Sequence, residues 1–193
     1  MPLTKQEWLA LEKKAHELRK LCLDTTFWAG SAHIGGGMSV MDMMTVLYHK
    51  YMHLDKEDPN WEDRDRFILS KGHAGVAYAA VLCDYGYNNP EQLKTFNLSN
   101  SKMGIHLDSN KVKGADASTG SLGHGLSIAA GTALAARIKG KDYKTFCILG
   151  EDYAYRTMNC WGLHRYASSR LRMPSSYQNP YRPKPNPYPP ESV

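Results

Sequence analysis

Histidines with glycine neighbours are the residues of this chain with the clearest potential for chemistry. Four of the eight histidines have a glycine within two residues in loop-like segments, and these are His33, His73, His106 and His124. A free imidazole has a pKa of about 6.5, so it exchanges protons near neutral pH. Neighbouring glycines let a ligand approach the backbone closely. Any one of these histidines alone is better explained by a local structural hydrogen bond, but four such loops favour a shared site.

A second candidate is the glycine- and hydroxyl-rich segment Ser118-Thr119-Gly120-Ser121-Leu122-Gly123-His124-Gly125. It is compatible with a flexible loop that caps a helix, and also with backbone N–H groups presented to a phosphate-bearing cofactor. Spacing alone leaves both interpretations open. Zinc is disfavoured, because the histidines form no closely spaced pair and no thiol or carboxylate motif accompanies them.

Five helices are expected around these loops, one of them opening at the cap Asn89-Pro90-Glu91, which has proline at the first helical position. The first opens at Thr4-Lys5-Gln6-Glu7, which has capping-box spacing, and the second runs from Ser39 to about Tyr51. The third covers about Gly75 to Tyr85 and stops at Gly86, and the last covers Leu122 to Ile138. The first helix has a single apolar face, formed by Trp8, Leu11, Ala15, Leu18, Cys22 and Thr25.

Two short apolar runs, 66–69 and 144–149, are predicted to be buried strands, and 97–120 is predicted to be a long functional loop. Strands that alternate with helices imply an α/β fold of three layers, a parallel sheet with helices on both faces. Ligands of such sheets bind beyond the carboxyl ends of the strands.

Composition narrows the class of protein. The chain has 193 residues, 42% of them hydrophobic, and a formal net charge of +5, which excludes a disordered or collagen-like chain for the bulk of the sequence. The four cysteines form no C-x-x-C pair, which favours free thiols in a reducing compartment. No apolar run approaches the length of a membrane span, and the charge-dense N-terminus is unlike a signal peptide. These features predict a cytoplasmic location and no membrane partner.

Four sequence blocks, in order and spacing, resemble the N-terminal part of transketolases, and most closely the split type in which this part is a separate subunit. The blocks are Ser31-Ala32-His33-Ile34-Gly35-Gly36, Asp65-Arg66-Phe67-Ile68-Leu69-Ser70-Lys71-Gly72-His73-Ala74, Gly104-Ile105-His106, and Ser118 to Gly125. The resemblance implies a thiamin diphosphate-binding fold over residues 1–150, incomplete in its C-terminal part. It also implies transfer of a two-carbon ketol unit between sugar phosphates, in the pentose phosphate pathway, with thiamine diphosphate and Mg as cofactors.

The resemblance also assigns roles to residues. It implies that His33, His73 and His106 are catalytic, although Leu107 follows His106 where the family usually has proline. It implies that the cofactor contacts His73, Gly120, Ser121, Leu122 and Gly150. His124 stands where many members have glutamine, so the resemblance gives it no role. The implied partners are a C-terminal pyrimidine-binding subunit, sugar phosphates and further copies of the chain.

The metal-binding motif of the family is altered here. Family members have Gly-Asp-Gly-Glu after the second strand, whereas this chain has Gly150-Glu151-Asp152-Tyr153. Glu151 and Asp152 are the candidate magnesium ligands, but a longer side chain and a lost glycine weaken an octahedral site. A solvated loop is the alternative interpretation.

Residues 151–193 differ from the rest in composition, being rich in Pro, Arg, Tyr and Ser, and are expected to be a divergent, disordered tail. The abrupt change is typical of translation in a shifted reading frame. Three alternatives to an active transketolase subunit remain open: an inactive truncated remnant, a related enzyme such as deoxyxylulose-phosphate synthase, and a tail that binds nucleic acid or proline-recognition domains. The small charge of the tail argues against nucleic acid.

Overall fold

The first helix shows how closely local sequence sets its own boundaries. In a computed structural model, which describes residues 3–150, α1 spans Lys5–Ala29. The Thr4 hydroxyl accepts a hydrogen bond from the Glu7 N–H at 3.2 Å, and the Glu7 carboxylate accepts one from the Thr4 N–H at 2.9 Å. This is the predicted capping box. The predicted apolar face is buried at Ala15, Leu18, Cys22 and Thr25, whereas Trp8 is 52% exposed.

The second helix begins earlier than predicted. α2 spans Ile34–Val46 and continues into a π-helical turn, η1, Leu47–Tyr51. The predicted start at Ser39 was wrong because three consecutive glycines disfavour a helix locally. Tertiary packing reverses that preference, since a Cβ added at Gly37 would lie 3.3 Å from Val76 and 3.4 Å from Ala77. The small residue lets α2 approach the third helix closely.

The sheet forms from two parallel strands, as predicted. β1 (Arg66–Leu69) pairs with β2 (Thr145–Ile148) in a register that sets Arg66 opposite Thr145 and Leu69 opposite Ile148. Between the strands the chain forms a short 3₁₀ turn η2 (Gly72–Ala74), α3 (Gly75–Tyr85), a 3₁₀ helix η3 (Pro90–Thr95) and α4 (His124–Ile138). The boundaries of α3 match the prediction, and α4 begins two residues later than predicted.

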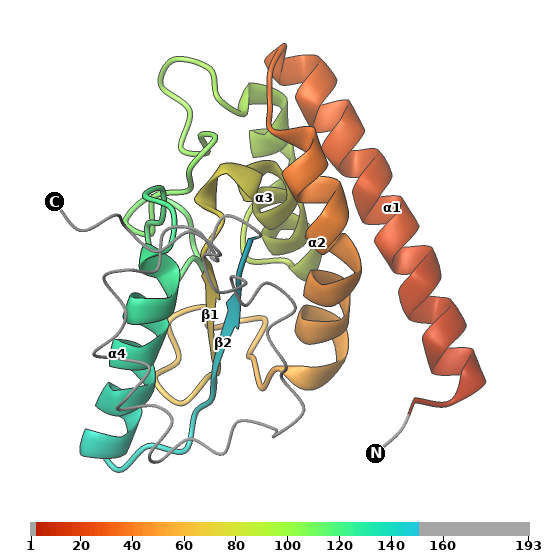
Figure 1. The fold of residues 1–193 in the computed structure, drawn as a ribbon. Coiled ribbons are helices and arrows are strands. Elements are labelled where there is room, and N and C mark those ends of the chain that lie inside the picture. Colours follow the sequence, from red (N-terminus) through yellow and green to blue (C-terminus); the bar gives the residue numbers. More distant parts are fainter. Residues whose placement is uncertain (1–2, 151–193) are drawn as a thin grey trace, which may run out of the picture.

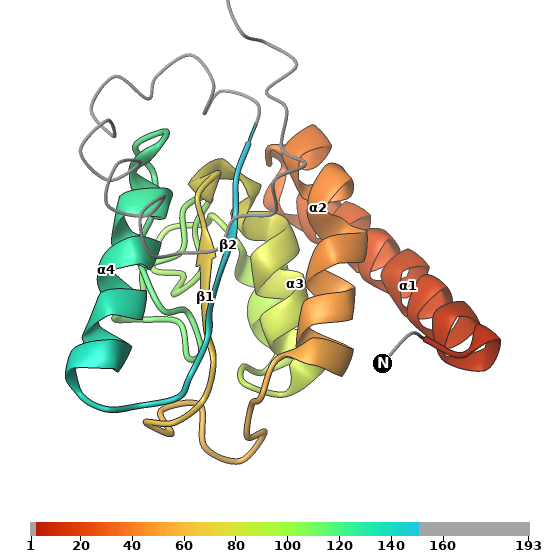
Figure 2. The ribbon, with the colours of Figure 1, turned by 60° about the horizontal axis from the view of Figure 1, so that its bottom comes forward.

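The elements stack in layers. α4 covers one face of the sheet, α3 and α2 cover the other, and α1 lies outside them (Figures 1 and 2). This arrangement confirms the expected α/β class with helices on both faces. The core is centred on α3, in which only Asp84 escapes burial, and on Phe67, Met41 and Leu18 beside it.

Some predictions concern residues that the structure does not describe. The predicted disordered tail, residues 151–193, lies beyond the described residues, as do Glu151 and Asp152. Within 3–150, no helix combines the length and the apolar character that crossing a membrane requires.

Candidate functional site

The predicted site residues gather at the edge of the sheet where both strands end. β1 and β2 point the same way, and the first turns of α2, α3 and α4 lie at the end to which the strands point (Figure 1). The segments that carry His33, His73, His106 and Gly120 all connect to this edge. The fold therefore places the candidate residues where ligands of parallel sheets bind.

His33 and His73 are in direct contact. Their ring centroids are 5.4 Å apart and the ring planes meet at 75°. His33 is the N-cap of α2, and His73 lies in the turn that follows β1. Gly36 makes room for this pair, because a Cβ added there would lie 3.3 Å from Cδ2 and from Nε2 of His73.

The long loop 97–120 joins the site through contacts with glycines. A Cβ on Gly72 would collide with the backbone carbonyl of Thr119, and one on Gly75 would collide with the carbonyl of Ile105. The loop therefore lies directly against the turn that holds His73. Only glycine permits this approach at the two positions.

His106 lies beside the glycine-rich segment. A Cβ added at Gly120 would lie 3.3 Å from Cδ2 of His106, and the imidazole is exposed. Ile105, one residue earlier, is the neighbour of Gly75, and Thr119, one residue before Gly120, is the neighbour of Gly72. These contacts bring the predicted catalytic histidines and the predicted cofactor-binding turn to one locality.

The last histidine of the four begins α4. Gly123, the N-cap, has φ +85°, which favours glycine, and His124 is exposed. Gly125 packs on the residue after β1, since a Cβ there would lie 2.5 Å from the Ser70 Cα. The first turn of α4 is therefore held against the carboxyl end of β1.

The helices at this edge share an electrostatic property. In α2, α3 and α4 the N-cap side chain makes no capping hydrogen bond, whereas α1, which begins elsewhere, has a full capping box. Helix N-termini carry partial positive charge and unpaired N–H groups. The edge is consequently suited to an anionic ligand such as a diphosphate.

Lys71 is a site residue that the sequence interpretation missed. Its ammonium group donates a hydrogen bond to the Ser39 hydroxyl at 2.7 Å, and a Cβ on Gly150 would lie 3.4 Å from the Lys71 Cβ. It therefore adds a positive charge next to the end of β2. Its position between Ser70 and Gly72, directly after a strand, was the available signal.

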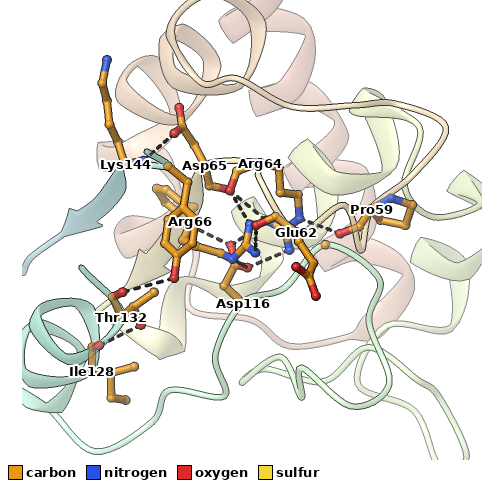
Figure 3. Close-up of polar contacts among 12 residues, drawn as sticks. Pro59, Glu62, Arg64, Asp65, Arg66, Asp116, Ile128, Thr132 and Lys144 are labelled. Atoms are coloured by element: carbon orange, nitrogen blue, oxygen red, sulfur yellow. Dashed lines mark hydrogen bonds and ion pairs between the residues drawn. The ribbon is translucent and has the colours of Figure 1, made fainter. Parts of the chain in front are cut away.

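A buried polar network lies around the first residues of β1. Arg64 donates two hydrogen bonds to the Asp116 carboxylate, at 3.0 and 2.7 Å, and Asp65 accepts the Lys144 N–H at 2.7 Å (Figure 3). Asp65 also accepts the His53 N–H at 2.8 Å. Burial lowers the pKa of Arg64, but the hydrogen bonds with Asp116 and the negative charge of its carboxylate together outweigh this and hold the pKa above its ordinary value. Sequence interpretation missed this network because its members lie far apart along the chain.

The three cysteine thiols within residues 3–150 are protected from ionisation. Burial raises the pKa of Cys22 and of Cys83 to about 12, and that of Cys147 to about 11. Thiolate is the nucleophilic form of cysteine, so these three side chains are unsuited to covalent catalysis at neutral pH.

A cavity of about 430 Å³ lies at the opposite edge of the sheet, lined among others by Asp65, Lys141 and Tyr143. None of the predicted catalytic or cofactor-binding residues lines it. We place the site at the carboxyl edge because the histidines, glycine-rich turn and helix N-termini meet there.

The described residues contain no candidate metal site. Over residues 3–150, no group of three or more His, Cys, Asp or Glu is arranged to hold a metal ion. The predicted ligands Glu151 and Asp152 lie beyond this range, so their geometry is not described.

Transketolases are among the known proteins that this chain resembles. A family model described as the thiamine diphosphate binding domain of transketolase matches residues 11–159. The 6-deoxy-6-sulfo-D-fructose transketolase subunit SqwG of Clostridium sp. (strain MSTE9) is 36% identical over 146 residues, which are 76% of this chain and 53% of that protein. One subunit of the apulose-4-phosphate transketolase of Phocaeicola vulgatus is 35% identical over 141 residues, 73% of this chain and 50% of the relative. The chain thus spans about half the length of these two curated relatives.

Solved structures agree in fold. Transketolase from Campylobacter jejuni superposes with a TM-score of 0.73 at 29% identity, covering 81% of this chain and 25% of that one. Transketolase from Leishmania mexicana gives a TM-score of 0.70 at 32% identity, covering 76% of this chain and 23% of that one.

Proposed function

Because this chain belongs to the family of transketolase thiamine diphosphate-binding domains, we propose that it is the cofactor-binding N-terminal subunit of a two-subunit transketolase. The activity proposed is the transfer of a two-carbon ketol unit from a ketose phosphate to an aldose phosphate. The site would be completed by a C-terminal pyrimidine-binding subunit, since SqwG and the apulose-4-phosphate relative are themselves named as transketolase subunits. We also propose that the enzyme acts in the cytoplasm, in the pentose phosphate pathway.

One observation carries this proposal. Three helices without side-chain caps begin at the edge where the His33–His73 pair and the Gly120 turn meet. The partial positive charge of helix N-termini suits a diphosphate, and the imidazoles suit proton transfer to and from substrate oxygens. Thiamine diphosphate fits this donor set, and when bound it supplies a carbon nucleophile and an electron sink.

The residues of this chain would bind the cofactor and orient the substrate. The first turn of α4 and His73 would hold the diphosphate, and the backbone of Gly120, Ser121 and Leu122 would contact the rings. His33 and His106 would hold or move protons at the substrate oxygens. Gly150 would contact the cofactor from the end of β2.

Glu151 and Asp152 are the residues that we propose as ligands of magnesium. Because the altered motif weakens an octahedral site, we derive no catalytic step from the metal. The same alteration favours the second candidate function, that of an inactive remnant of such a subunit.

Titration of the full chain with thiamine diphosphate tests the proposal. We expect saturable quenching of tryptophan fluorescence, and much weaker binding of thiamine monophosphate, because only the diphosphate reaches the helix N-termini fully. Repeating the titration with EDTA reports whether magnesium is required. Absence of saturable binding at millimolar cofactor, with or without magnesium, would contradict the proposal and support the remnant.

A further inference from the structure

The outer edge of β1 is closed by side chains. The N–H groups of Arg66 and Ser70 donate to carbonyls of Lys144 and Ile148, each at 2.8 Å, so the even-numbered residues of β1 face β2. Successive backbone groups of a strand point to opposite sides. The N–H of Phe67 and the carbonyl of Leu69 accordingly face away from β2. The edge they form needs other partners.

Segment 116–119 supplies these partners. The Asp116 carboxylate accepts the Phe67 N–H at 2.8 Å, and the Thr119 hydroxyl donates to the Leu69 carbonyl at 2.6 Å. Two hydrogen bonds, two residues apart on β1, thus hold the four residues of segment 116–119 alongside the strand. The segment takes the place of a neighbouring strand without forming one.

Asp116 is fixed by more than β1. Its side chain is 6% exposed, and both carboxylate oxygens accept hydrogen bonds from the Arg64 guanidinium, whose side chain is 8% exposed. The Arg64 Nε donates in turn to the Pro59 carbonyl at 2.6 Å (Figure 3). A buried, bidentate pair of this kind holds a fixed orientation.

The held segment leads directly into the proposed cofactor-binding turn. Thr119 is 9% exposed, its carbonyl lies against Gly72 beside His73, and Gly120 lies against the His106 ring. A shift of segment 116–119 along β1 would therefore move Gly120 relative to both histidines. Catalytic groups lose effect when displaced by about 1 Å.

We infer that Asp116 is a positioning residue for the cofactor-binding turn Gly120–Leu122, an inference that rests on the proposed function. It acts through its bonds to Phe67 and Arg64, which fix the segment that ends in the turn.

The test measures backbone order of the full chain without cofactor, by ¹H–¹⁵N heteronuclear NOE, in Asp116→Asn and in Leu82→Ala. We expect lower values at 118–122 in Asp116→Asn and unchanged values in α3. Leu82, fully buried in α3, is the control for general destabilisation and should leave 118–122 unchanged. Unchanged order at 118–122 in Asp116→Asn, or an equal loss in both variants, would overturn the inference.

Thr119→Val and Thr119→Ser keep the test decisive if Asp116→Asn does not fold. Valine removes only the hydroxyl bond to Leu69, and serine retains it. We expect loss of order at 118–122 with valine and its recovery with serine. Equal order in the two variants would count against the inference.

Cofactor affinity then separates the two proposals. If the unaltered chain binds thiamine diphosphate, Asp116→Asn should weaken binding by about tenfold or more, and Leu82→Ala should not, at temperatures where both are folded. If the unaltered chain does not bind it, the proposed function fails, while the NOE data still decide whether Asp116 positions the turn.

Discussion

The imidazole rings of His33 and His73 meet edge to face, with centroids 5.4 Å apart, although forty residues separate them along the chain. The contact joins the first turn of α2 to the turn after β1. Gly36 lies against the same His73 ring, so the pair depends on the absence of a side chain in α2.

Gly36→Ala should disturb this pair. The new Cβ would lie 3.3 Å from the His73 ring, which must move by a few tenths of an ångström. We expect weaker binding of thiamine diphosphate, measured by fluorescence titration. Gly35→Ala is the matched control, because a Cβ there meets nothing within 4 Å. Equal affinities of the two variants would show that the His73 position does not matter for the cofactor.

Gly125→Ala should destabilise the fold. Its Cβ would lie 2.5 Å from both Cα and Cβ of Ser70, and backbone cannot yield easily, so we expect a loss of about 1–3 kcal/mol. Gly131→Ala, in the same helix but in open space, should gain up to about 1 kcal/mol from helix propensity. Urea denaturation followed by circular dichroism measures both. A stable Gly125→Ala would mean that α4 does not contact β1 as closely as described.

His106→Ala should lower turnover rather than cofactor affinity. A positioned acid or base contributes about 10²–10⁴-fold to rate, so kcat of the reconstituted two-subunit enzyme should fall within this range. His16→Ala, on the exposed surface of α1, is the control and should leave kcat unchanged. A matching loss in cofactor affinity would instead assign His106 to binding.

Stability should fall in acid through Asp84. The contact with His49, whose Nε2 lies 3.2 Å from the Asp84 carboxylate, is the largest cause that lowers the Asp84 pKa, and burial opposes this less than the His49 and Lys14 contacts together favour it. A carboxyl group with a lowered folded pKa stabilises the fold above its unfolded pKa of about 4, and this stabilisation is lost as pH falls through the folded value. Melting temperatures of the unaltered chain and Asp84→Asn should therefore differ at pH 6 and converge below about pH 4. A difference that stays constant with pH would assign the effect to packing.

Local sequence predicted those elements whose signals are local. The capping box of α1 and the stop of α3 at Gly86 depend on residues a few positions apart, and both are confirmed. The start of α2 was wrong because Gly37 is helical only through its contact with Val76 and Ala77.

The site residues also divide into those that local sequence could reveal and those that it could not. The glycine-flanked histidines could be recognised from their loops, and all four loops meet through contacts of Gly36, Gly72 and Gly120. Asp116 could not be recognised, because its partners Arg64 and Phe67 lie 52 and 49 residues away. Nothing near Asp116 in the sequence indicates that its carboxylate closes a strand edge.

The separation of the two strands in sequence has a consequence for synthesis of the chain. Asp65 accepts the N–H of Lys144, a residue 79 positions later, whereas α1, α2 and α3 contact one another within the first 85 residues. Contacts between neighbouring segments form faster than contacts across long loops. The helical layer can therefore assemble on the ribosome while the partner strand of β1 is still unmade, and β1 must wait for the second half of the chain to receive that partner.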